Sequence, residues 1–406
     1  MKVTIINCGS SSIKYAMFDM STRDLLGSGL LERIGTKESR VRHRRRNDHG
    51  TYDEILMHEP VANHAEGFEF ILTVAAKMRI LENPNELFGI GHRVVHGGEV
   101  YRGPVLIDQE VIARIRELIP LAPLHNPANI KGIEIAIGRL PDVPQVAVFD
   151  TSFHAQMPPT AFHYALPYKL YEEHHIRRYG FHGNSHHYVA KRAAALLGKP
   201  LESLNLITLH LGNGASAAAI LRGKSVDTSM GMTPLEGLVM GTRSGDLDPA
   251  IHFYLLSETG MSIEEVESML NSESGLKGIC GSNDMREIGK LADEGNPRAK
   301  LAMDMYCYRI KKQIGAYFAV LGRVDAIVFT GGIGENSKMI REGTCEGLSG
   351  LGISMDAKKN DRVAGDELEI QDDRSAVKIM VIPTNEELEI ADHAVETIKA
   401  ERDRSD

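Results

Sequence analysis

The chain has 406 residues, which at roughly 150 residues per domain predicts two or three domains with cores of their own. Apolar residues make up 42% and charged residues 25%, a composition that excludes a disordered or fibrous chain and predicts a soluble globular protein. The net charge is −9, so the chain lacks the overall positive charge with which many proteins bind nucleic acid. We therefore expect any anion to be bound locally, and no nucleic acid as a partner.

The four cysteines lie far apart in the sequence, without a C-x-x-C pair. This spacing fits neither a disulfide framework nor a zinc ribbon, and it suits a reducing compartment. No run of about 18 apolar residues occurs, and the N-terminus leads into a short apolar stretch without a cleavage-site pattern. We therefore expect a cytoplasmic protein that does not associate with a membrane.

The chain begins with a predicted strand, a turn of glycine and serine, and a second strand. Residues 3–7 (VTIIN) are mostly apolar, the turn follows at 8–12 (CGSSS), and residues 13–19 (IKYAMFD) place Ile13, Tyr15 and Met17 on one face. The same plan recurs at residues 206–221, where LITLHL is followed by GNGAS and AAAIL. We therefore predict two halves of similar construction. The basic run RVRHRRR between them is interpreted as a solvated loop or a strand edge, with a nucleic-acid patch as the alternative.

Later apolar strands lead into polar or glycine-rich ends. Residues 146–149 precede an aspartate, residues 326–329 precede GGIGEN, and residues 379–382 precede TNE. Ligands of α/β sheets gather at such strand ends. Amphipathic stretches at 263–270 and 299–321 separate the strands, so the predicted class is α/β with at least two sheets.

The last segment is predicted to be a helix. Thr384 and Glu387 match a T-x-x-E capping box, and apolar residues follow at helical spacing. We expect this helix to pack on a core, that of the first domain.

The glycine turns raise three nucleotide-binding hypotheses. A Walker A loop fails because Ala218 stands where its first glycine is needed, and the G-x-G-x-x-A match at Gly212 is not followed by a helical pattern. Hairpin turns that present backbone N–H groups to phosphate remain. The segment 331–336 (GGIGEN) favours close contact with a nucleotide, and Lys14 is either an exposed strand lysine or a phosphate ligand of the first turn.

Several polar residues stand in small or apolar surroundings. Arg93 and Arg243 each need an anionic partner, for which an internal salt bridge is the alternative to a ligand. His182 lies between glycines and is either an anion ligand or an ordinary loop histidine, while H-E-x-x-H is absent and a zinc site is disfavoured. Asp150, Asn7 and Glu386 sit at strand ends or a helix start, where their oxygens could surround hydrated Mg²⁺ or serve as turn and capping groups.

Seven long motifs carry a resemblance to a known family. They are NCGSSSIK at 7–14, HRVVHGG at 92–98, FDTSFHAQMP at 149–158, RRYGFHGNSH at 177–186, DTSMGMTPLEGLVMGTRSGDLDP at 227–249, FTGGIGENS at 329–337 and PTNEEL at 383–388. Over essentially its whole length the chain closely resembles the acetate and propionate kinase (acetokinase) family, within the sugar kinase, Hsp70 and actin superfamily.

The resemblance implies an α/β, two-domain, duplicated ribonuclease H-like (actin-like ATPase) fold with a central cleft. Residues 1–150 plus 386–406 would form the N-terminal domain completed by the C-terminal helix, and residues 151–385 a second domain carrying most of the nucleotide site. It implies a homodimer and reversible, Mg²⁺-dependent transfer of the γ-phosphoryl group of ATP to acetate, giving acetyl phosphate and ADP by direct in-line transfer. A propionate or other short-chain acyl kinase is the alternative. An intact glycine segment disfavours a pyrophosphate-dependent relative, and a nucleotide-gated binding module would leave the charged residues unexplained.

The resemblance also implies residue roles. Asp150, His182 and Arg243 would be catalytic, Asn7 and Glu386 would hold Mg²⁺, for which Mn²⁺ can substitute, and Arg93 would bind the substrate carboxylate beside an acyl wall of Val95, Leu124, Phe181 and Pro234. ATP or ADP would contact Lys14, His210, Leu211, Gly212, Asn213, Gly214, Asp284, Met285, Arg286, Gly332, Ile333, Gly334, Glu335 and Asn336. Ser152, Asn184, Ala215 and Lys277 depart from the family pattern, and none of them replaces a charged catalytic group.

Because acetate is already ionised at neutral pH, the transfer needs little base catalysis, and its difficulty is to align one anion with a polyanion. We therefore hypothesise that Asp150 orients water on Mg²⁺ or aligns an arginine instead of transferring a proton. A β-branched Val95 fills the space that a longer acyl chain would need, and one methylene changes selectivity by about 10- to 200-fold. We expect propionate to be a poorer but real substrate.

Overall fold

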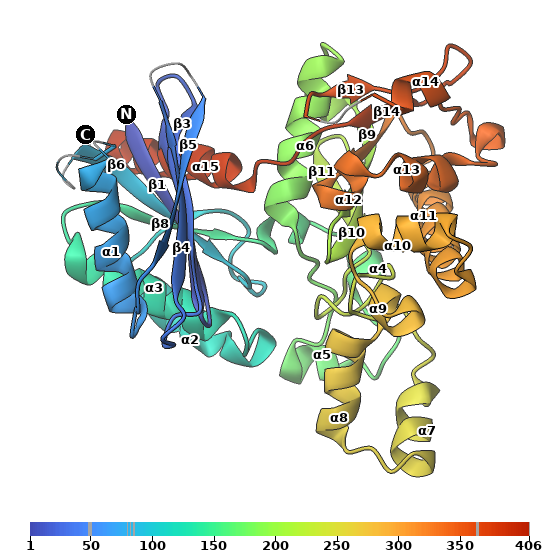
Figure 1. The fold of residues 1–406 in the computed structure, drawn as a ribbon, viewed down its shortest axis with the longest axis horizontal. Helices are drawn as coiled ribbons and strands as arrows, with labels where there is room; N and C mark the ends of the chain where they lie inside the picture. The colour runs from blue at the N-terminus through green and yellow to red at the C-terminus, as the bar shows by residue number, and fades with distance from the viewer. Residues whose placement is uncertain (48–50, 79, 82, 84–85, 363–364, 406) are drawn as a thin grey trace. The chain divides into compact units, whose positions relative to one another are not determined.

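The computed structural model describes residues 1–47, 51–78, 80, 81, 83, 86–362 and 365–405. These residues form two compact units, the first from 1–152 with 385–406 and the second from 153–384. Each unit is built on a mixed β-sheet with helices, as the α/β prediction required (Figure 1). None of the described helices is both long enough and apolar enough to cross a membrane.

The first unit contains an eight-stranded sheet in the order β5-β4-β3-β2-β1-β6-β8-β7. Its strands are β1 (Lys2–Gly9), β2 (Ser12–Asp19), β3 (Asp24–Glu32), β4 (Arg40–Arg46), β5 (Tyr52–His58), β6 (Leu87–Val94), β7 (Val105–Leu106) and β8 (Gln145–Phe149). Its helices are α1 (His64–Lys77), α2 (Gln109–Glu117), the 3-10 helix η2 (Ile119–Leu121), α3 (Asn126–Arg139) and α15 (Glu386–Ser405). Strands β1, β6 and β8 are neighbours and parallel, so their carboxyl ends reach the same edge of the sheet.

Both faces of this sheet are buried. Ile13, Tyr15 and Met17 of β2 lie in one apolar cluster with residues of α1, as their alternation predicted. Ala16 and Phe18 belong to a different apolar cluster, which contains residues of α15. The central strands can therefore carry apolar side chains on both faces, which is why they lack a clean alternation of apolar and polar residues.

The predicted capping box at the start of α15 is wrong by one residue. The helix begins at Glu386, and the side-chain Oδ1 of Asn385 accepts a hydrogen bond from the Leu388 N–H at 3.0 Å. Glu387 instead forms an ion pair with Lys14 of β2. An asparagine caps a helix as well as a threonine does, so the local pattern TNEEL contained two equally good candidates.

The basic run is also corrected, because β4 is neither a loop nor an edge strand. It lies between β3 and β5, with Val41 fully buried. Its arginines face acidic residues on the neighbouring strands, with Arg40 Nε 2.9 Å from Glu32 Oε2 and Arg42 Nε 3.4 Å from Glu54 Oε1. The charges of this run are thus partly balanced within the sheet.

The chain passes from the first unit to the second within the 3-10 helix η3 (Ser152–His154). The sheet of the second unit has the order β11-β10-β9-β12-β14-β13, from strands β9 (Asn205–Leu211), β10 (Ala215–Leu221), β11 (Lys224–Thr228), β12 (Ala326–Thr330), β13 (Leu368–Glu369) and β14 (Lys378–Val381). The helices are α4 (Pro159–Phe162), α5 (Lys169–His174), α6 (Gly183–Leu196), η4 (Leu201–Ser203), α7 (Ala250–Glu258), α8 (Ile263–Ser268), the π-helix η5 (Met269–Glu273), α9 (Gly275–Cys280), α10 (Met285–Asp293), α11 (Pro297–Leu321), α12 (Gly331–Asn336), α13 (Lys338–Cys345), η6 (Ser349–Leu351) and α14 (Ala357–Asn360).

The two sheets share one topology, which confirms the predicted duplication. In the first, β3-β2-β1-β6-β8 comprises two antiparallel pairs followed by two parallel pairs, and β11-β10-β9-β12-β14 repeats that pattern. The predicted helix at 299–321 is α11, whereas the one at 263–270 becomes a π-helix after Ser268.

Candidate active site

The predicted site residues fall into two sets, each within one unit. The first unit holds Asn7, Lys14, Arg93, Val95, Leu124, Asp150 and Glu386. The second unit holds Phe181, His182, His210, Leu211, Gly212, Asn213, Gly214, Pro234, Arg243, Asp284, Met285, Arg286, Gly332, Ile333, Gly334, Glu335 and Asn336.

Three residues of the first set lie where neighbouring parallel strands end. Asn7 is near the end of β1, Arg93 is near the end of β6, and Asp150 directly follows β8. The backbone N–H of Asp150 donates to the Val94 carbonyl at 2.9 Å. This bond extends the hydrogen bonding between β6 and β8 by one residue and fixes Asp150 at the carboxyl end of these strands. The structure thus brings together groups that are far apart in sequence.

Arg93 and Asp150 form an ion pair through one edge of the guanidinium group. Nη2 of Arg93 lies 2.5 Å from Oδ2 of Asp150, and Nε lies 3.3 Å from Oδ1. Asp150 is almost fully buried, whereas the Arg93 side chain keeps 22% of its surface exposed. Because Asp150 occupies the Nε and Nη2 edge, the end of the guanidinium formed by Nη1 and Nη2 can still take a second carboxylate.

Glu386, the first residue of α15, carries a perturbed carboxyl group. Burial raises its pKa to about 7, with a further rise from the negative charge of Asp150 and an opposing effect of Arg93. Burial is the larger cause, so the charged carboxylate is disfavoured mainly because it is desolvated. Together with the amide oxygen of Asn7, the Glu386 carboxylate offers the hard oxygen donors that suit Mg²⁺.

The two members of the acyl wall in this unit differ in burial. Val95 is 6% exposed, whereas Leu124, in the segment that follows η2, is 77% exposed. Sequence reasoning missed what holds Val95, namely Asn129 of α3, whose Oδ1 accepts from the Val95 N–H at 3.1 Å and whose Nδ2 donates to the Cys8 carbonyl at 2.9 Å. Asn129 and Asn126 are buried polar residues of α3, and their roles follow only from the fold.

In the second unit, His182 and Arg243 flank Gly214. A Cβ added at Gly214 would lie 3.4 Å from Cε1 of His182 and 3.5 Å from Nη1 of Arg243. His182 has a left-handed backbone at the start of α6, with φ of 57°, and its Nδ1 lies 2.9 Å from Oγ of Ser216. Its ring stacks on His210 with centroids 4.1 Å apart.

Arg243 has no carboxylate partner among the described residues. Its Nη1 donates to the Pro234 carbonyl at 3.2 Å and contacts the Met240 sulfur at 3.8 Å. Burial lowers the pKa of the guanidinium, because the charged form is partly desolvated without a nearby negative charge. An anionic ligand would relieve this cost, so the salt-bridge alternative does not apply to Arg243.

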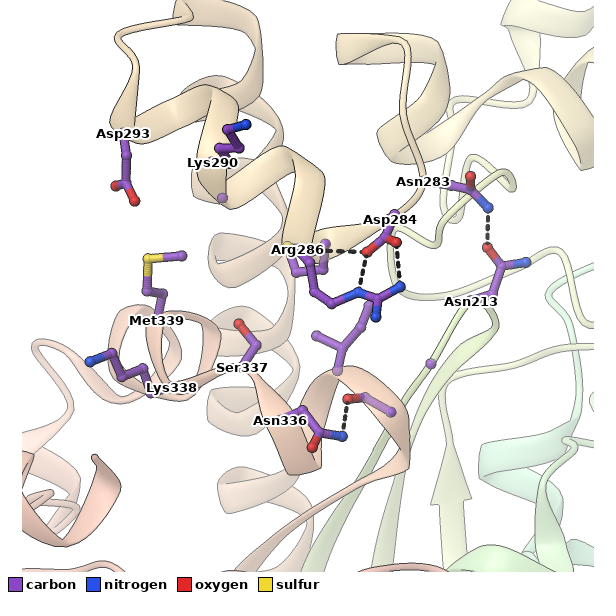
Figure 2. A pocket seen from close by; sticks show the side chains of 15 residues that line it. Asn213, Asn283, Asp284, Arg286, Lys290, Asp293, Asn336, Ser337, Lys338 and Met339 are labelled. Carbon is purple, nitrogen blue, oxygen red and sulfur yellow. Dashed lines mark hydrogen bonds and ion pairs between the residues drawn. The ribbon is translucent and has the colours of Figure 1, made fainter. Parts of the chain in front are cut away.

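A pocket of about 1120 Å³ lies within the second unit, between the turn after β9, helix α10 and helix α12 (Figure 2). Its lining includes the predicted residues Gly212, Asn213, Asp284, Met285, Arg286, Gly332, Ile333 and Asn336. It also includes residues that sequence reasoning missed, namely Asn283, Gly289, Lys290, Asp293, Ser337, Lys338 and Met339. Gly289, Lys290 and Asp293 all lie on α10, and their place in the pocket follows from the position of that helix and not from a sequence motif.

Polar contacts order this pocket before any ligand is present. Asp284 caps α10 by accepting from the Arg286 N–H at 2.9 Å, and its Oδ2 lies 2.6 Å from Nη2 of Arg286. Asn283 Nδ2 donates to Asn213 Oδ1 at 2.9 Å, which links the segment just before α10 to the turn after β9 (Figure 2).

The glycine segment after β12 forms the short helix α12. Gly331 has φ of 76°, and a Cβ there would lie 2.8 Å from the Leu211 carbonyl oxygen, so only glycine fits. Glu335 does not line the pocket, because its Oε1 accepts from the N–H groups of Gly331 at 2.8 Å and Thr384 at 3.1 Å. This carboxylate ties the start of α12 to the segment after β14.

Comparison with known proteins identifies one family for this chain. A sequence model described as the Acetokinase family matches residues 2–392. The acetate kinase of Syntrophobacter fumaroxidans is 58% identical over 400 residues, which cover 98% of this chain and 97% of that protein. The crystal structure of Porphyromonas gingivalis acetate kinase superposes with a TM-score of 0.93 at 44% identity, covering 98% of this chain and 99% of that one. A propionate kinase from Francisella tularensis gives 0.90 at 44% identity, with 97% and 99% covered. The resemblance expected from the motifs is thereby confirmed, and the chain belongs to the Acetokinase family of phosphotransferases.

Proposed function

We propose that this protein is an acetate kinase, which reversibly transfers the γ-phosphoryl group of ATP to acetate and gives acetyl phosphate and ADP. The observation that carries the proposal is the arrangement of Arg93, whose guanidinium has one edge on Asp150 and its other end open to a carboxylate. Val95, two residues further on, is buried and would face a short acyl group. The high identity to a named acetate kinase supports the same substrate.

In the proposed mechanism the first unit holds the nucleophile. The end of the Arg93 guanidinium binds the acetate carboxylate, and Asp150 keeps that guanidinium in place through its Nε edge. Lys14 would leave its ion pair with Glu387 to contact ATP, a change that costs little for a side chain that is 55% exposed.

Asn7 and Glu386 would hold Mg²⁺, or Mn²⁺ in its place. The fit rests on their hard oxygen donors and on the pKa of Glu386, which is raised first by burial and then by the negative charge of Asp150, and a bound divalent cation would offset both effects. When bound, Mg²⁺ supplies positive charge to the phosphate oxygens. Asp150, which is paired with Arg93, helps to orient this donor set.

The second unit would bind the nucleotide and stabilise the transferring group. The pocket between α10 and α12 takes ATP or ADP, with backbone groups of the glycine segments approaching it closely. Arg243 and His182, on either side of Gly214, stabilise the negative charge of the phosphoryl oxygens. They do so while the phosphoryl group passes in line between an oxygen of ADP and a carboxylate oxygen of acetate. We propose that the two compact units are the functional domains of this reaction.

Formation of acyl phosphate tests the proposal. The protein is incubated with ATP, Mg²⁺ and acetate, propionate or butyrate, and the acyl phosphate is trapped as its hydroxamate. We expect acetate to give the highest kcat/KM and propionate a lower one, within about 10- to 200-fold. No product with any of the three would refute the kinase proposal and favour a nucleotide-gated binding module. A preference for propionate would favour the alternative represented by the propionate kinase relative.

A variant of Arg243 tests the mechanism more narrowly. Arg243→Ala should lower kcat by about 10³-fold or more, as for other arginines that stabilise phosphoryl transfer, while the KM for acetate changes little. Arg374→Ala is the matched control, since its side chain is 86% exposed and, within the part of the chain that the structure describes, pairs with Asp372. A loss of less than tenfold would refute the assigned role.

We also propose a homodimer, with helix α7 as part of its interface. None of the residues of α7 is buried, and its aromatic residues Phe253 and Tyr254 are 72% and 65% exposed. Ile263, at the start of the neighbouring helix α8, is 69% exposed. Exposed aromatic residues in such a cluster are typical of interfaces. Sedimentation velocity should give a dimer that Phe253→Asp dissociates, whereas Tyr308→Asp, at an exposed position of α11, should not. A monomer at micromolar concentration would refute the proposal.

A further inference from the structure

A cluster of polar residues that the proposed function does not use holds the loop carrying Arg243. Nη1 of Arg178 donates to three successive carbonyl groups, those of Thr228 and Ser229 at 3.1 Å and that of Met230 at 3.2 Å. Its Nη2 lies 2.5 Å from Oε1 of Glu236. The Arg178 guanidinium thereby contacts both ends of the segment 228–236 and holds them close together.

Tyr164 completes this cluster from the other side. Its hydroxyl donates to Oε2 of Glu236 and accepts a hydrogen bond from the Met232 N–H at 2.9 Å. Burial and the neighbouring carboxylate raise the pKa of Tyr164, so the phenol remains a donor at neutral pH. Gly231 lies between them, where a Cβ would overlap both Glu236 and the Tyr164 hydroxyl. Every group of this cluster is therefore fixed by at least one partner.

The cluster connects to both loops that carry proposed catalytic residues. The N–H groups of Tyr179 and Gly180 donate to the Gly231 carbonyl at 3.0 and 3.1 Å, just before Phe181 and His182 in the chain. On the other loop, Nη1 of Arg243 donates to the carbonyl of Pro234, two residues before Glu236. The far end of that loop is closed by Asp246, whose Oδ1 accepts from the Gly237 N–H at 2.7 Å.

The charges of the cluster also favour an unpaired Arg243. Glu236 lies near Arg243 in sequence, but Arg178 and Tyr164 take both of its oxygens. The carboxylate is thus neutralised by a different arginine, and Arg243 keeps no carboxylate partner among the described residues. If Glu236 were released, it could pair with Arg243 and compete with a phosphoryl group.

We propose that Tyr164, Arg178 and Glu236 are positioning residues for phosphoryl transfer, because they fix the Pro234 carbonyl and thereby the guanidinium of Arg243. This inference rests on the proposed function, since it assumes that Arg243 meets the transferring phosphoryl group. It goes further by assigning a role to three residues that contact neither the nucleotide pocket nor Arg243 directly.

The test uses Tyr164→Phe and Glu236→Gln, with Tyr168→Phe as the control because that ring is 59% exposed. Tyr164→Phe should lower kcat about tenfold, while the KM values for ATP and acetate change less than twofold. In the Arg243→Ala background, Tyr164→Phe should cause no further loss, since its effect passes through Arg243. Equal losses in both backgrounds, or no loss in the wild-type background, would overturn the inference.

A second readout does not depend on turnover. The ¹⁵N–¹H resonance of the Arg243 side chain, assigned by its absence in Arg243→Lys, should shift in Tyr164→Phe and Glu236→Gln and stay in place in Tyr168→Phe. If the wild-type protein makes no acyl phosphate but the resonance shifts, the positioning role stands and the proposed function fails. If the wild-type protein is active and the resonance does not move, the positioning role is wrong.

Discussion

The replacement Asp150→Asn separates two roles for a carboxylate at the edge of the first sheet. Asparagine keeps the shape and one acceptor oxygen of the side chain but removes its charge. If Asp150 aligns Arg93, the variant should bind acetate more weakly. If Asp150 transfers a proton, the variant should bind acetate normally and fail to turn over. The two-point contact of Arg93 with Asp150, at 2.5 and 3.3 Å, favours alignment.

The geometry sets the size of the expected effect. A hydrogen bond between charged groups contributes about 1.5–3 kcal/mol and a neutral one about 1 kcal/mol. Only the contact between Nη2 and Oδ2 is short. In the variant, the interaction that holds the Arg93 guanidinium in place should therefore weaken by about 1–2 kcal/mol. At about 1.4 kcal/mol per factor of ten, the KM for acetate should rise about 5- to 30-fold. General acid or base catalysis would instead contribute about 10²- to 10⁴-fold to kcat.

The assay measures acyl hydroxamate while acetate, and then Mg²⁺, is varied at saturating ATP. We also expect the Mg²⁺ dependence of Asp150→Asn to change, because the charge of Asp150 acts on Glu386. Asp142→Asn is the control, an exposed aspartate in the same unit. A loss of kcat by about 10²-fold or more, with unchanged KM for acetate and unchanged metal dependence, would refute the alignment hypothesis.

Three further predictions concern other residues. Val95→Ala should raise the ratio of the kcat/KM for propionate to that for acetate about tenfold, because it removes methyl groups from a buried position. An unchanged ratio would exclude Val95 from the acyl wall. Gly331→Ala should destabilise the protein by about 1–3 kcal/mol in urea unfolding, because alanine at φ of 76° is strained and its Cβ would crowd Leu211, and unchanged stability would contradict that account. Burial lowers the pKa of His92 to about 4, partly offset by Gln145. As pH falls from about 6.5 to 4, the unfolded chain therefore binds a proton at this histidine before the folded protein does. The stability that the neutral His92 contributes is complete above pH 6.5 and is lost as pH falls towards 4. His92→Gln should therefore flatten the slope of unfolding free energy against pH in that range.

The sequence predicted the features that depend on neighbouring residues. The strand, turn and strand at each half could be recognised because alternation and glycine are local signals, and Ile13, Tyr15 and Met17 lie on one buried face as expected. The start of α15 was misplaced by one residue because Thr384 and Asn385 are both good caps, and only the backbone position of Leu388 decides between them.

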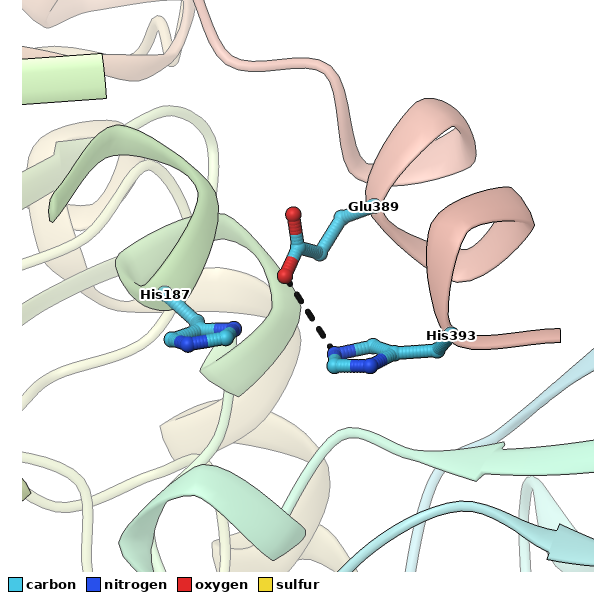
Figure 3. Close-up of side chains that lie close together, drawn as sticks. All are labelled: His187, Glu389 and His393. Atoms are coloured by element: carbon cyan, nitrogen blue, oxygen red, sulfur yellow. Dashed lines mark ion pairs between the residues drawn. The ribbon is translucent and has the colours of Figure 1, made fainter. Parts of the chain in front are cut away.

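Residues that act through pairing across the chain were not predicted. Asn129 contacts Val95 from 34 positions away, and Arg178 contacts Glu236 from 58 positions away. No local periodicity relates such residues, so their roles follow only from the fold. Glu389 and His393 are a contrasting case, because they lie one turn apart on α15, with Oε1 and Nε2 3.3 Å apart, a pairing that helical spacing alone allows (Figure 3).

Buried arginines show how a chain of net charge −9 can bind a polyanion. Arg178 is matched by Glu236, and Arg341 is satisfied by the carbonyls of Gly334 and Glu335 and by Asn360, so both serve the structure. Arg93 gives only one edge to Asp150, and among the described residues the Arg243 guanidinium contacts the Pro234 carbonyl oxygen and the Met240 sulfur but no carboxylate. Burial of incompletely paired guanidinium groups costs stability in the absence of ligand, and that cost is recovered when an anion arrives. Incomplete pairing therefore distinguishes the arginines proposed to act on substrate from those that hold the fold.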